Sequence, residues 1–403
     1  MNALAGRFPG LTCFVALVVL FGFFRYVHAL AVLLWEAPFI DFAHYYTYAT
    51  VVRLGQNPFD PEAVAAVDAL LAIRRAGSAA NYPPFFYLLM QPWTLLDFRV
   101  AALTWFGLAQ ACVAGAIALC LRRVEPLPFV GVAATVFVVC NYQPLIENLA
   151  LGQTNPLLLF LVTLAWWAAR AERAWLAAAC VALCPLVKPQ YALLLPALWW
   201  MGQRRVLGRA LLLLAAGLAL SLAALGVPHH VEYLGYLAAP PDYLRTWTAN
   251  LSPSATLHRL LSPRDGGRFL AMALTVVVDA VFVVVFARAI PRGLSSASPT
   301  FDRAWALAIV AIPLLSPLTE EHHLVLLLFP LALLLSTRGE TSLLSMENVL
   351  LIGSALLLGS RFSLERFPVF HQGVPSLLAT GKLIGALCLA WLLTRVLRKT
   401  TRA

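Results

Sequence analysis

Long apolar runs, separated by short polar turns, dominate this sequence from about residue 11 to residue 396. A helix that crosses a bilayer needs about 20 consecutive, mostly apolar residues. The chain has 403 residues, of which 61% are hydrophobic and 12% are charged. A soluble domain carries about twice that charged share. This balance excludes a water-soluble enzyme, a disordered scaffold and a disulfide-rich secreted module, and it predicts an all-α polytopic membrane protein.

The apolar runs predict about 12 transmembrane helices. They lie near residues 11–35, 99–121, 127–146, 155–169, 174–187, 190–203, 206–227, 269–289, 304–317, 323–337, 343–360 and 376–396. Several are short and bounded by proline, which a membrane tolerates where helix ends are buried in protein or line a wet cavity. We interpret the first run as a membrane helix, because it is long enough to span and no cleavage site follows it.

The net charge of +10 comes from 29 basic and 19 acidic residues. The basic residues gather in short clusters between the apolar runs, at 122–123, 170–173, 204–209, 288–292 and 395–402. Basic loops stay in the cytoplasm, so we interpret this charge as a topology signal and expect the lipid bilayer, and no nucleic acid, as a partner. All the clusters fall on one side if residues 83–96 form an elbow in the outer interface.

The sequence predicts a single membrane domain over residues 1–403. A core module covers residues 1–227 and includes an outer loop at 36–82, in which Val64, Val67 and Leu71 form one face of an expected interfacial helix. A second outer loop covers residues 228–268, and residues 269–403 supply the C-terminal transmembrane helices.

Asp41 follows the first apolar run within a few residues, in the sequence Asp-Phe-Ala-His-Tyr-Tyr that also contains His44 and Tyr45. A carboxylate at the membrane edge is costly unless it is paired or used. Two interpretations stay open for Asp41 at this point: a functional carboxylate and a solvated helix cap.

Lys188 is the only lysine in the first 381 residues. It is expected at an outer turn between two apolar runs, whereas the basic residues that set membrane topology lie in cytoplasmic loops. A compact ammonium at a helix break suits an anionic group such as a phosphate. The alternative is a lysine whose stem lies along apolar surface while its charge reaches water.

Four ionisable residues in a row, Glu320, Glu321, His322 and His323, join two apolar runs. Histidine and glutamate are metal ligands. However, consecutive helical residues point about 100° apart, and no further ligand pair has matching spacing. We therefore expect no metal here and favour a contact with a phosphate leaving group.

Four further polar residues lie in expected outer turns: Asn57, Tyr82, Gln153 and Asn155. Their local sequences are Asn-Pro-Phe-Asp, Asn-Tyr-Pro-Pro and Gly-Gln-Thr-Asn. Each pattern by itself predicts only a turn.

Taken in order, these motifs resemble glycosyltransferase family 87, which comprises membrane enzymes of the GT-C fold that use polyprenyl-phosphate sugars, such as mycobacterial mannosyltransferases. The matching pieces are Asp41 with Tyr45, residues 55–59, residues 82–84, residues 152–155, residues 188–189, and residues 316–317 followed by His322 and His323. They cover roughly residues 36–325. The sequence departs from the family pattern at Glu320 and Glu321, where a tryptophan and a variable residue often precede the histidine.

The resemblance implies a GT-C bundle with its core in residues 1–227 and an inverting reaction with Asp41 as the catalytic base. We expect the donor phosphate to contact Lys188, His322 and His323. We expect the sugar and the acceptor to contact a further set, namely His44, Tyr45, Asn57, Tyr82, Gln153, Asn155, Glu320 and Glu321.

The predicted function is transfer of a sugar, most simply mannose, from a polyprenyl-phosphate donor to a glycolipid or polysaccharide acceptor. The reaction is expected on the outer, periplasmic face of a bacterial plasma membrane, without a cofactor. No glycine-rich dinucleotide fingerprint occurs in the sequence, as a lipid-linked donor would lead one to expect. The alternatives are a transporter or flippase of lipid-linked sugars, for which paired halves with matching broken helices are typical, and a structural membrane subunit.

Overall fold

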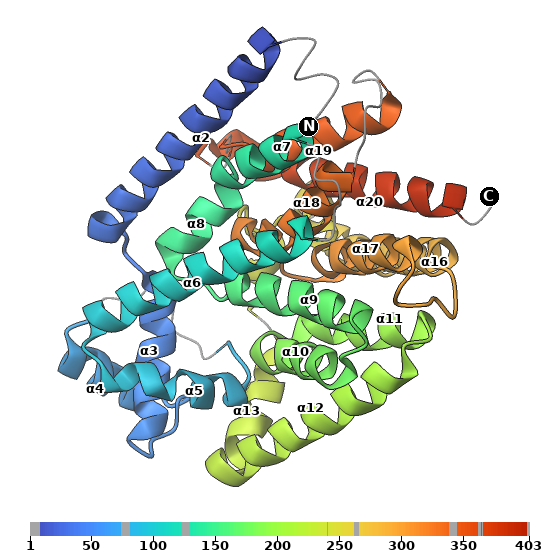
Figure 1. The fold of residues 1–403 in the computed structure, drawn as a ribbon. Coiled ribbons are helices and arrows are strands. Elements are labelled where there is room, and N and C mark those ends of the chain that lie inside the picture. The colour runs from blue at the N-terminus through green and yellow to red at the C-terminus, as the bar shows by residue number, and fades with distance from the viewer. Residues whose placement is uncertain are drawn as a thin grey trace.

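The computed structural model describes residues 9–73, 81–122, 129–239, 241–261, 266–337, 345–361, 364 and 366–400. Every regular element in these ranges is a helix (Figure 1). One continuous set of buried apolar side chains extends from Tyr26 to Leu397. The structure therefore confirms the predicted all-α class.

In the described part of the chain, five apolar helical segments are long enough to cross a bilayer. They are Cys13–Glu36 in α2 (Pro9–Glu36), α6 (Phe98–Leu121), α12 (Arg204–Leu225), α16 (Gly267–Ala289) and Val374–Lys399, which contains all but the last residue of α20 (Gly381–Thr400). Large apolar side chains on these helices point outward; Phe21 of α2 is 66% exposed and Phe269 of α16 is 78% exposed. An apolar surface of this length is suited to lipid, not water.

A sixth span is possible if α7 (Phe129–Cys140) and α8 (Gln143–Leu151), which are bent by 42° at their junction, act as one. The other apolar runs form shorter helices. These are α9 (Asn155–Arg170), α10 (Ala174–Val187), α11 (Leu194–Trp200), α17 (Pro299–Leu315), α18 (Leu328–Thr337) and α19 (Met346–Gly359), with 3₁₀ turns η2 (Pro189–Leu193) and η3 (Glu321–Leu327) before α11 and α18. The predicted count of about 12 spanning helices is thus not confirmed.

Proline explains why one predicted span is broken. The run at 190–203 divides into η2 and α11, and Pro189 begins η2. Proline lacks a backbone N–H and restricts the residue before it to extended conformations. Lys188, which precedes Pro189, accordingly has φ −140° and ψ 118°.

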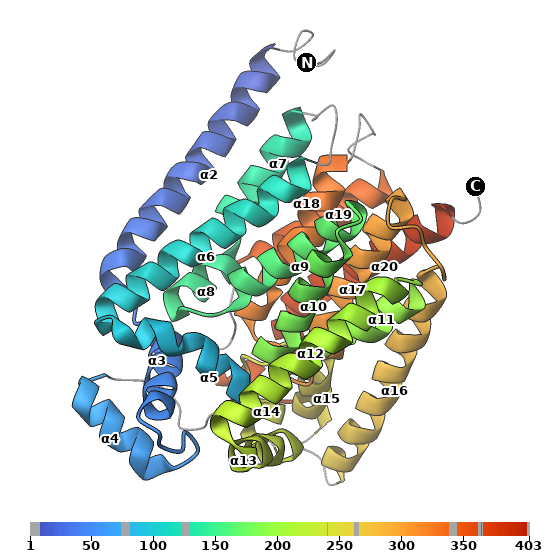
Figure 2. The same ribbon diagram turned by 60° about the horizontal axis from the view of Figure 1, so that its bottom comes forward.

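Short helices cover one end of the bundle. They are α3 (Ile40–Arg53), α4 (Pro61–Leu71), α5 (Pro84–Met90), η1 (Gln91–Leu95), α13 (Val227–Ala238), α14 (Tyr243–Thr246), α15 (Pro253–Leu261), η4 (Pro368–Phe370) and η5 (Val374–Thr380). Figure 2 shows α3, α4 and α13 at this end, with the first turns of α2 at the other. The predicted interfacial helix is α4, which buries Val64 and Val67, and the elbow at 83–96 consists of α5 and η1, each too short to cross.

The basic loops meet at the opposite end from the polar candidate residues. Arg170, which ends α9, donates to the carbonyl of Ala297 at 2.7 Å, and Gln203 donates to that of Leu294 at 2.6 Å. The other ends of α9 and α10 carry Asn155 and Lys188. Since α9 has 16 residues, about 24 Å separates the two ends.

Candidate active site

Helix α3 presents Asp41 in its first turn, directly after the first long helix. The chain bends at Phe39, whose φ of 44° is left-handed, and the Phe39 amide donates to the carbonyl of Ala150 at 3.1 Å. Asp41 and Tyr45 are four residues apart and so share one face of α3. This face points toward the turn that follows α8.

Gly152 allows that turn to approach α3 closely. It ends α8 with φ 73°, a conformation that glycine adopts without a steric penalty. A β-carbon at this position would lie 2.6 Å from the β-carbon of Phe42. Trp105 donates to the Gly152 carbonyl at 2.8 Å. The next residue, Gln153, is thereby placed beside α3.

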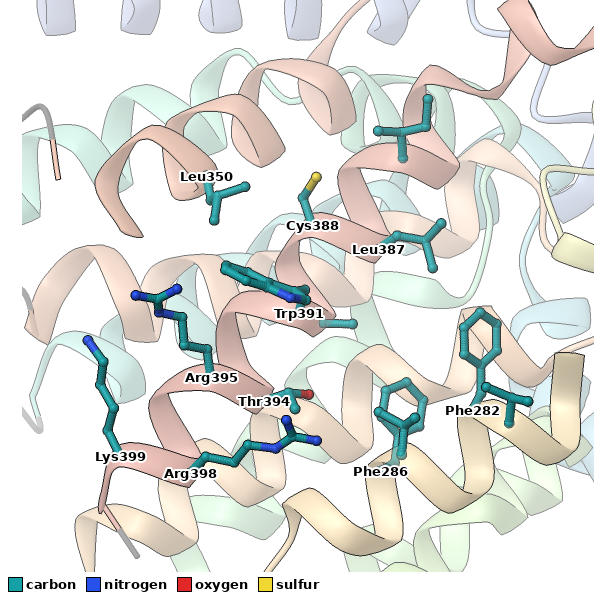
Figure 3. Close-up of a pocket in the computed structure, with 14 residues that line it drawn as sticks. Phe282, Phe286, Leu350, Leu387, Cys388, Trp391, Thr394, Arg395, Arg398 and Lys399 are labelled. Atoms are coloured by element: carbon teal, nitrogen blue, oxygen red, sulfur yellow. The ribbon is translucent and has the colours of Figure 1, made fainter. Parts of the chain in front are cut away.

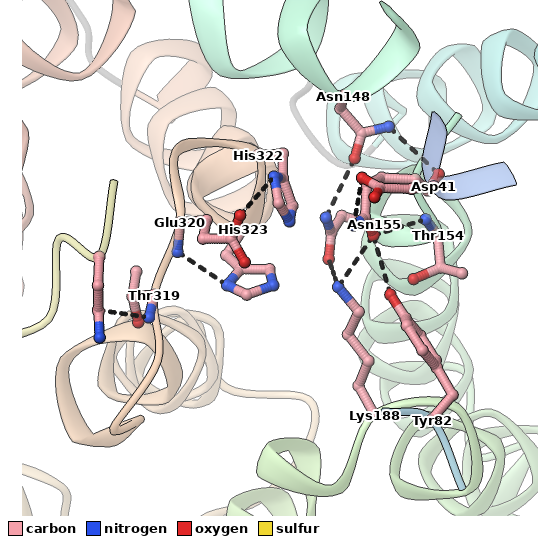
Figure 4. Close-up of polar contacts among 12 residues, drawn as sticks. Asp41, Tyr82, Asn148, Thr154, Asn155, Lys188, Thr319, Glu320, His322 and His323 are labelled. Atoms are coloured by element: carbon pink, nitrogen blue, oxygen red, sulfur yellow. Dashed lines mark hydrogen bonds and ion pairs between the residues drawn. The ribbon is translucent and has the colours of Figure 1, made fainter. Parts of the chain in front are cut away.

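Gln153 connects the polar side chains of this half of the site. Its Nε2 donates to Asp41 Oδ2 at 2.8 Å. Its Oε1 accepts from the hydroxyls of Tyr45 at 2.7 Å and Tyr82 at 3.0 Å, and from Lys188 Nζ at 3.2 Å. The two tyrosine hydroxyls are 2.6 Å apart. Figure 4 shows Asp41, Tyr82 and Lys188 converging from three separate segments.

Lys188 is 5% exposed and lies in the break between α10 and η2. Besides its contact with Gln153, its Nζ donates to Asn155 Oδ1 at 3.1 Å and lies 5.6 Å from the centre of the Tyr82 ring. Both hydrogen-bond acceptors are neutral amide oxygens. A buried ammonium in this setting is well placed to attract a further anionic group.

Asn148 supports this arrangement, although the sequence analysis did not single it out. Its Oδ1 accepts from Asn155 Nδ2 at 3.1 Å, and its Nδ2 donates to the Gln153 carbonyl at 3.3 Å. The side chain is fully buried. A buried amide needs hydrogen-bond partners. The signal in the sequence for such a supporting role was an asparagine close to an apolar run.

The second half of the site is the turn between α17 and η3. Asn250, also not predicted, accepts at Oδ1 from the Thr319 amide at 3.1 Å, and the Leu251 amide donates to the Thr319 carbonyl at 2.6 Å. The Glu320 amide donates to His323 Nδ1 at 3.0 Å. The second outer loop therefore holds the turn that carries the two histidines.

The two histidines differ in what they contact. His323 uses one ring nitrogen to accept from Glu320 and also hydrogen bonds the backbone of Leu318. His322 is 1% exposed, and neither of its ring nitrogens has a hydrogen-bond partner among the residues that the structure describes. Its Nδ1 lies 3.8 Å from Glu320 Oε2. His323 is thus occupied in holding the turn, and His322 is the histidine with ring nitrogens available to a ligand.

Charge couples the two halves. Burial lowers the pKa of Lys188 to about 8, and the carboxylates of Glu320 and Asp41 oppose that effect by raising it. Burial raises the pKa of Asp41, whereas the hydrogen bond from Gln153 and the charge of Lys188 lower it. In Figure 4 the turn with Glu320 and His322 faces Lys188. Residues distant in sequence therefore form one electrostatic site.

Three predicted site residues make their contacts elsewhere. Asn57 accepts from the Phe59 amide at 2.9 Å and donates to Glu232 of α13 at 3.2 Å, as a turn residue does. His44 stacks on Tyr48, with the ring centres 4.2 Å apart. The third is Glu321, which pairs with Lys382 of α20. Within the described residues, the structure does not join Asn57 to the hydrogen bonds around Gln153.

Glu321 links the turn to the C-terminal helix. Its Oε1 lies 3.1 Å from Lys382 Nζ, and Lys382 also donates to the carbonyls of Leu358 and Ser360 at 3.0 and 2.6 Å. Lys382 is 6% exposed. The pair links η3 to α20, and the contact of Glu321 with a sugar stays a prediction.

Ligand atoms of Glu320, His322 and His323 lie within 4.8 Å of one another. A catalytic zinc site uses three protein ligands with free lone pairs. Because His323 already hydrogen bonds two backbone groups, only Glu320 and His322 remain. Among the described residues, binding of a metal ion by all three side chains would therefore require His323 to give up one of these hydrogen bonds.

Comparison with known proteins identifies the family. The model of glycosyltransferase family 87 matches residues 81–317, which is more than half of the 403 residues. No curated protein and no solved structure shows a significant match. The matched range contains Gln153, Asn155 and Lys188, while Asp41 and His322 lie outside it. An enzyme is thereby favoured over a transporter or a structural subunit: the chain belongs to glycosyltransferase family 87 and is a membrane glycosyltransferase.

Proposed function

We propose that this enzyme transfers a sugar, most simply mannose, from a polyprenyl-phosphate donor to a glycolipid or polysaccharide acceptor, with inversion at the anomeric carbon. The observation that carries the proposal is a half-buried carboxylate, Asp41, and a buried ammonium, Lys188, joined through Gln153 at one end of an apolar bundle. A lipid-linked donor reaches such a site from the bilayer, and its phosphate matches the ammonium.

Asp41 is the proposed general base. Inversion requires one displacement, in which an acceptor hydroxyl attacks the anomeric carbon while the bond from that carbon to the phosphate oxygen breaks. Asp41 takes the hydroxyl proton, and the phosphate keeps the bonding electron pair. Burial raises the pKa of Asp41, which makes its carboxylate a stronger base than an exposed aspartate.

Lys188 and His322 are the proposed contacts for the departing phosphate. Negative charge grows on the phosphate as the sugar–oxygen bond breaks, so a fixed cation stabilises the transition state more than the ground state. With a pKa of about 8, Lys188 is mostly protonated at neutral pH. His322 contributes ring nitrogens that have no other hydrogen-bond partner.

Transfer is proposed to occur on the outer face of a bacterial plasma membrane. The candidate site lies at the opposite end of α9 and α10 from the basic loops. Basic loops remain in the cytoplasm, which orients the site outward. Acceptors outside the cell, such as glycolipids and polysaccharides, would then be within reach.

The test is transfer by the purified protein from labelled polyprenyl-phosphomannose, with the anomeric configuration of the product determined by NMR. Asp41→Asn should reduce turnover by about 10²–10⁴-fold, the typical contribution of a general base. Asp60→Asn is the matched control, because Asp60 is the exposed cap of α4 and asparagine caps equally well. Near-normal turnover of Asp41→Asn, or transfer from a nucleotide sugar without lipid, would overturn the proposal.

A further inference from the structure

A small cavity adjoins the candidate active site. It measures about 10 Å³, room for about one water molecule, and lies between η2 and the turn that joins α17 to η3. Its lining includes Tyr191 of η2, Thr319 of the turn and His323 of η3. A larger cavity of about 750 Å³ lies between α16, α19 and α20 (Figure 3), and none of the described candidate site residues lines it. The small cavity therefore brings Tyr191 against the second half of the site.

Tyr191 also lies beside Lys188. Its amide donates to the Lys188 carbonyl at 3.2 Å, which closes a 3₁₀ turn. Residues three positions apart in such a turn lie above one another, so the two side chains share one face of the turn. Lys188 Nζ lies 5.6 Å from the centre of the Tyr82 ring, and the Tyr82 hydroxyl interacts electrostatically with that of Tyr191. Tyr191 thus borders both halves of the site.

The hydroxyl of Tyr191 is a buried hydrogen-bond donor. Tyr191 is 1% exposed, and its hydroxyl has no hydrogen-bond partner among the residues that the structure describes. Burial raises the pKa of this hydroxyl well above its usual value, and the nearby Cys184 and Tyr82 add to the effect, so the group keeps its proton. A buried donor without an acceptor costs stability. A ligand that brings an acceptor to this hydroxyl would remove that cost.

We propose that Tyr191 is a further contact for the phosphate of the lipid-linked donor, and that its hydroxyl donates a hydrogen bond to a phosphate oxygen beside Lys188. This assignment rests on the proposed function. Lys188 donates to two neutral amide oxygens, and a phosphate oxygen is a stronger acceptor than either. Negative charge grows on the phosphate as the sugar departs, so the hydrogen bond strengthens in the transition state while Tyr191 keeps its proton.

The experiment measures binding of a polyprenyl phosphate, and of the same polyprenol without phosphate, to the purified full-length protein in detergent. The wild-type protein should prefer the phosphate form. Tyr191→Phe removes only the hydroxyl, so it should weaken binding of the polyprenyl phosphate at least about tenfold and leave polyprenol binding unchanged. Tyr233→Phe is the matched control, because the hydroxyl of Tyr233 in α13 is also buried without a partner among the described residues. It should bind both lipids like the wild type.

Thermal melting separates a ligand contact from a structural role. Removal of a buried hydroxyl that has no partner should leave the melting temperature of either variant unchanged or raise it. Tyr191→Phe should therefore lose affinity for the phosphate form without losing stability. A lower melting temperature of Tyr191→Phe, together with equal weakening of both lipids, would assign the hydroxyl to packing and overturn the proposal.

The same binding data distinguish this proposal from the proposed function. If the wild-type protein binds the polyprenyl phosphate no more tightly than the polyprenol, the proposed donor class itself fails. If the wild type prefers the phosphate form and Tyr191→Phe keeps the full preference, the donor class stands and Tyr191 is not a phosphate contact. An equal loss of that preference in Tyr233→Phe would likewise contradict the assignment to Tyr191.

Discussion

Lys188 and Asp41 must carry opposite charges in the proposed reaction, so the rate should depend on pH. We expect a bell-shaped profile of kcat/KM, whose acid limb lies above the usual aspartate range and whose alkaline limb lies near pH 8. Activity falls on the acid side as Asp41 gains a proton and on the alkaline side as Lys188 loses one. The charge of Glu320 raises the pKa of Lys188, so Glu320→Gln should move the alkaline limb to lower pH.

The measurement is the pH profile of the wild-type enzyme and of Glu320→Gln under identical conditions. Glu62→Gln is the control, because Glu62 is exposed on α4 and should leave both limbs in place. A shift of the alkaline limb to higher pH in Glu320→Gln would contradict the electrostatic coupling between the turn and Lys188.

The two histidines should respond differently to the same substitution. Asparagine at 323 can present an oxygen to the Glu320 amide in place of Nδ1, so His323→Asn should keep the turn and most of the activity. His322→Asn removes the ring whose nitrogens have no other partner, and it should lower turnover by about 10²-fold if a contact of a few kcal/mol is lost. Single-turnover transfer at saturating donor distinguishes the two variants. Equal losses of turnover would show that both histidines act only by maintaining the conformation of the turn.

Gly152 lies in the turn between α8 and α9. It determines how closely this turn approaches α3. An alanine there would have a left-handed backbone, which costs about 1–2 kcal/mol, and its β-carbon would lie 2.6 Å from that of Phe42. Gly152→Ala should therefore lower the melting temperature and, by separating Gln153 from Asp41, also reduce transfer. Gly107→Ala is the matched control, because Gly107 lies on an exposed face of α6 with no neighbour within 4 Å; alanine there should be neutral or stabilising. Full activity in Gly152→Ala would argue against a role for this close approach.

At the scale of the whole molecule, the basic loops and the candidate site lie at opposite ends, which makes the orientation testable. Leu70 and Tyr243, which are 73% and 64% exposed, lie on the short helices of the proposed outer end. Cysteines at these two positions should react with a membrane-impermeant reagent from outside, and Arg205→Cys should not. Cys13 is exposed, so each variant is built with Cys13→Ala. Labelling of Arg205→Cys from outside would reverse the topology and with it the proposed outer site.

Much of the candidate site was predictable from motifs in the sequence. Tyr45, Tyr82, Gln153, Asn155 and Lys188 were all predicted, and the structure brings these side chains together with Asp41. Their catalytic and binding roles remain predictions. Asn148 and Asn250 were missed because an asparagine in a turn or beside an apolar run looks the same whether or not its amide supports a site.

The sequence by itself determined that this protein is a helical membrane protein, because hydropathy is local and a bilayer requires every backbone group to be satisfied within a helix. It also located the polar segments by their contrast with the apolar runs. Only the tertiary structure decided that Gln153 joins Asp41 to Lys188, and that His322 rather than His323 has available ring nitrogens. The first outcome depends on contacts between residues that are 112 and 35 positions apart along the chain. The second depends on the rotation of adjacent side chains in a turn, and neither has a local signature in sequence.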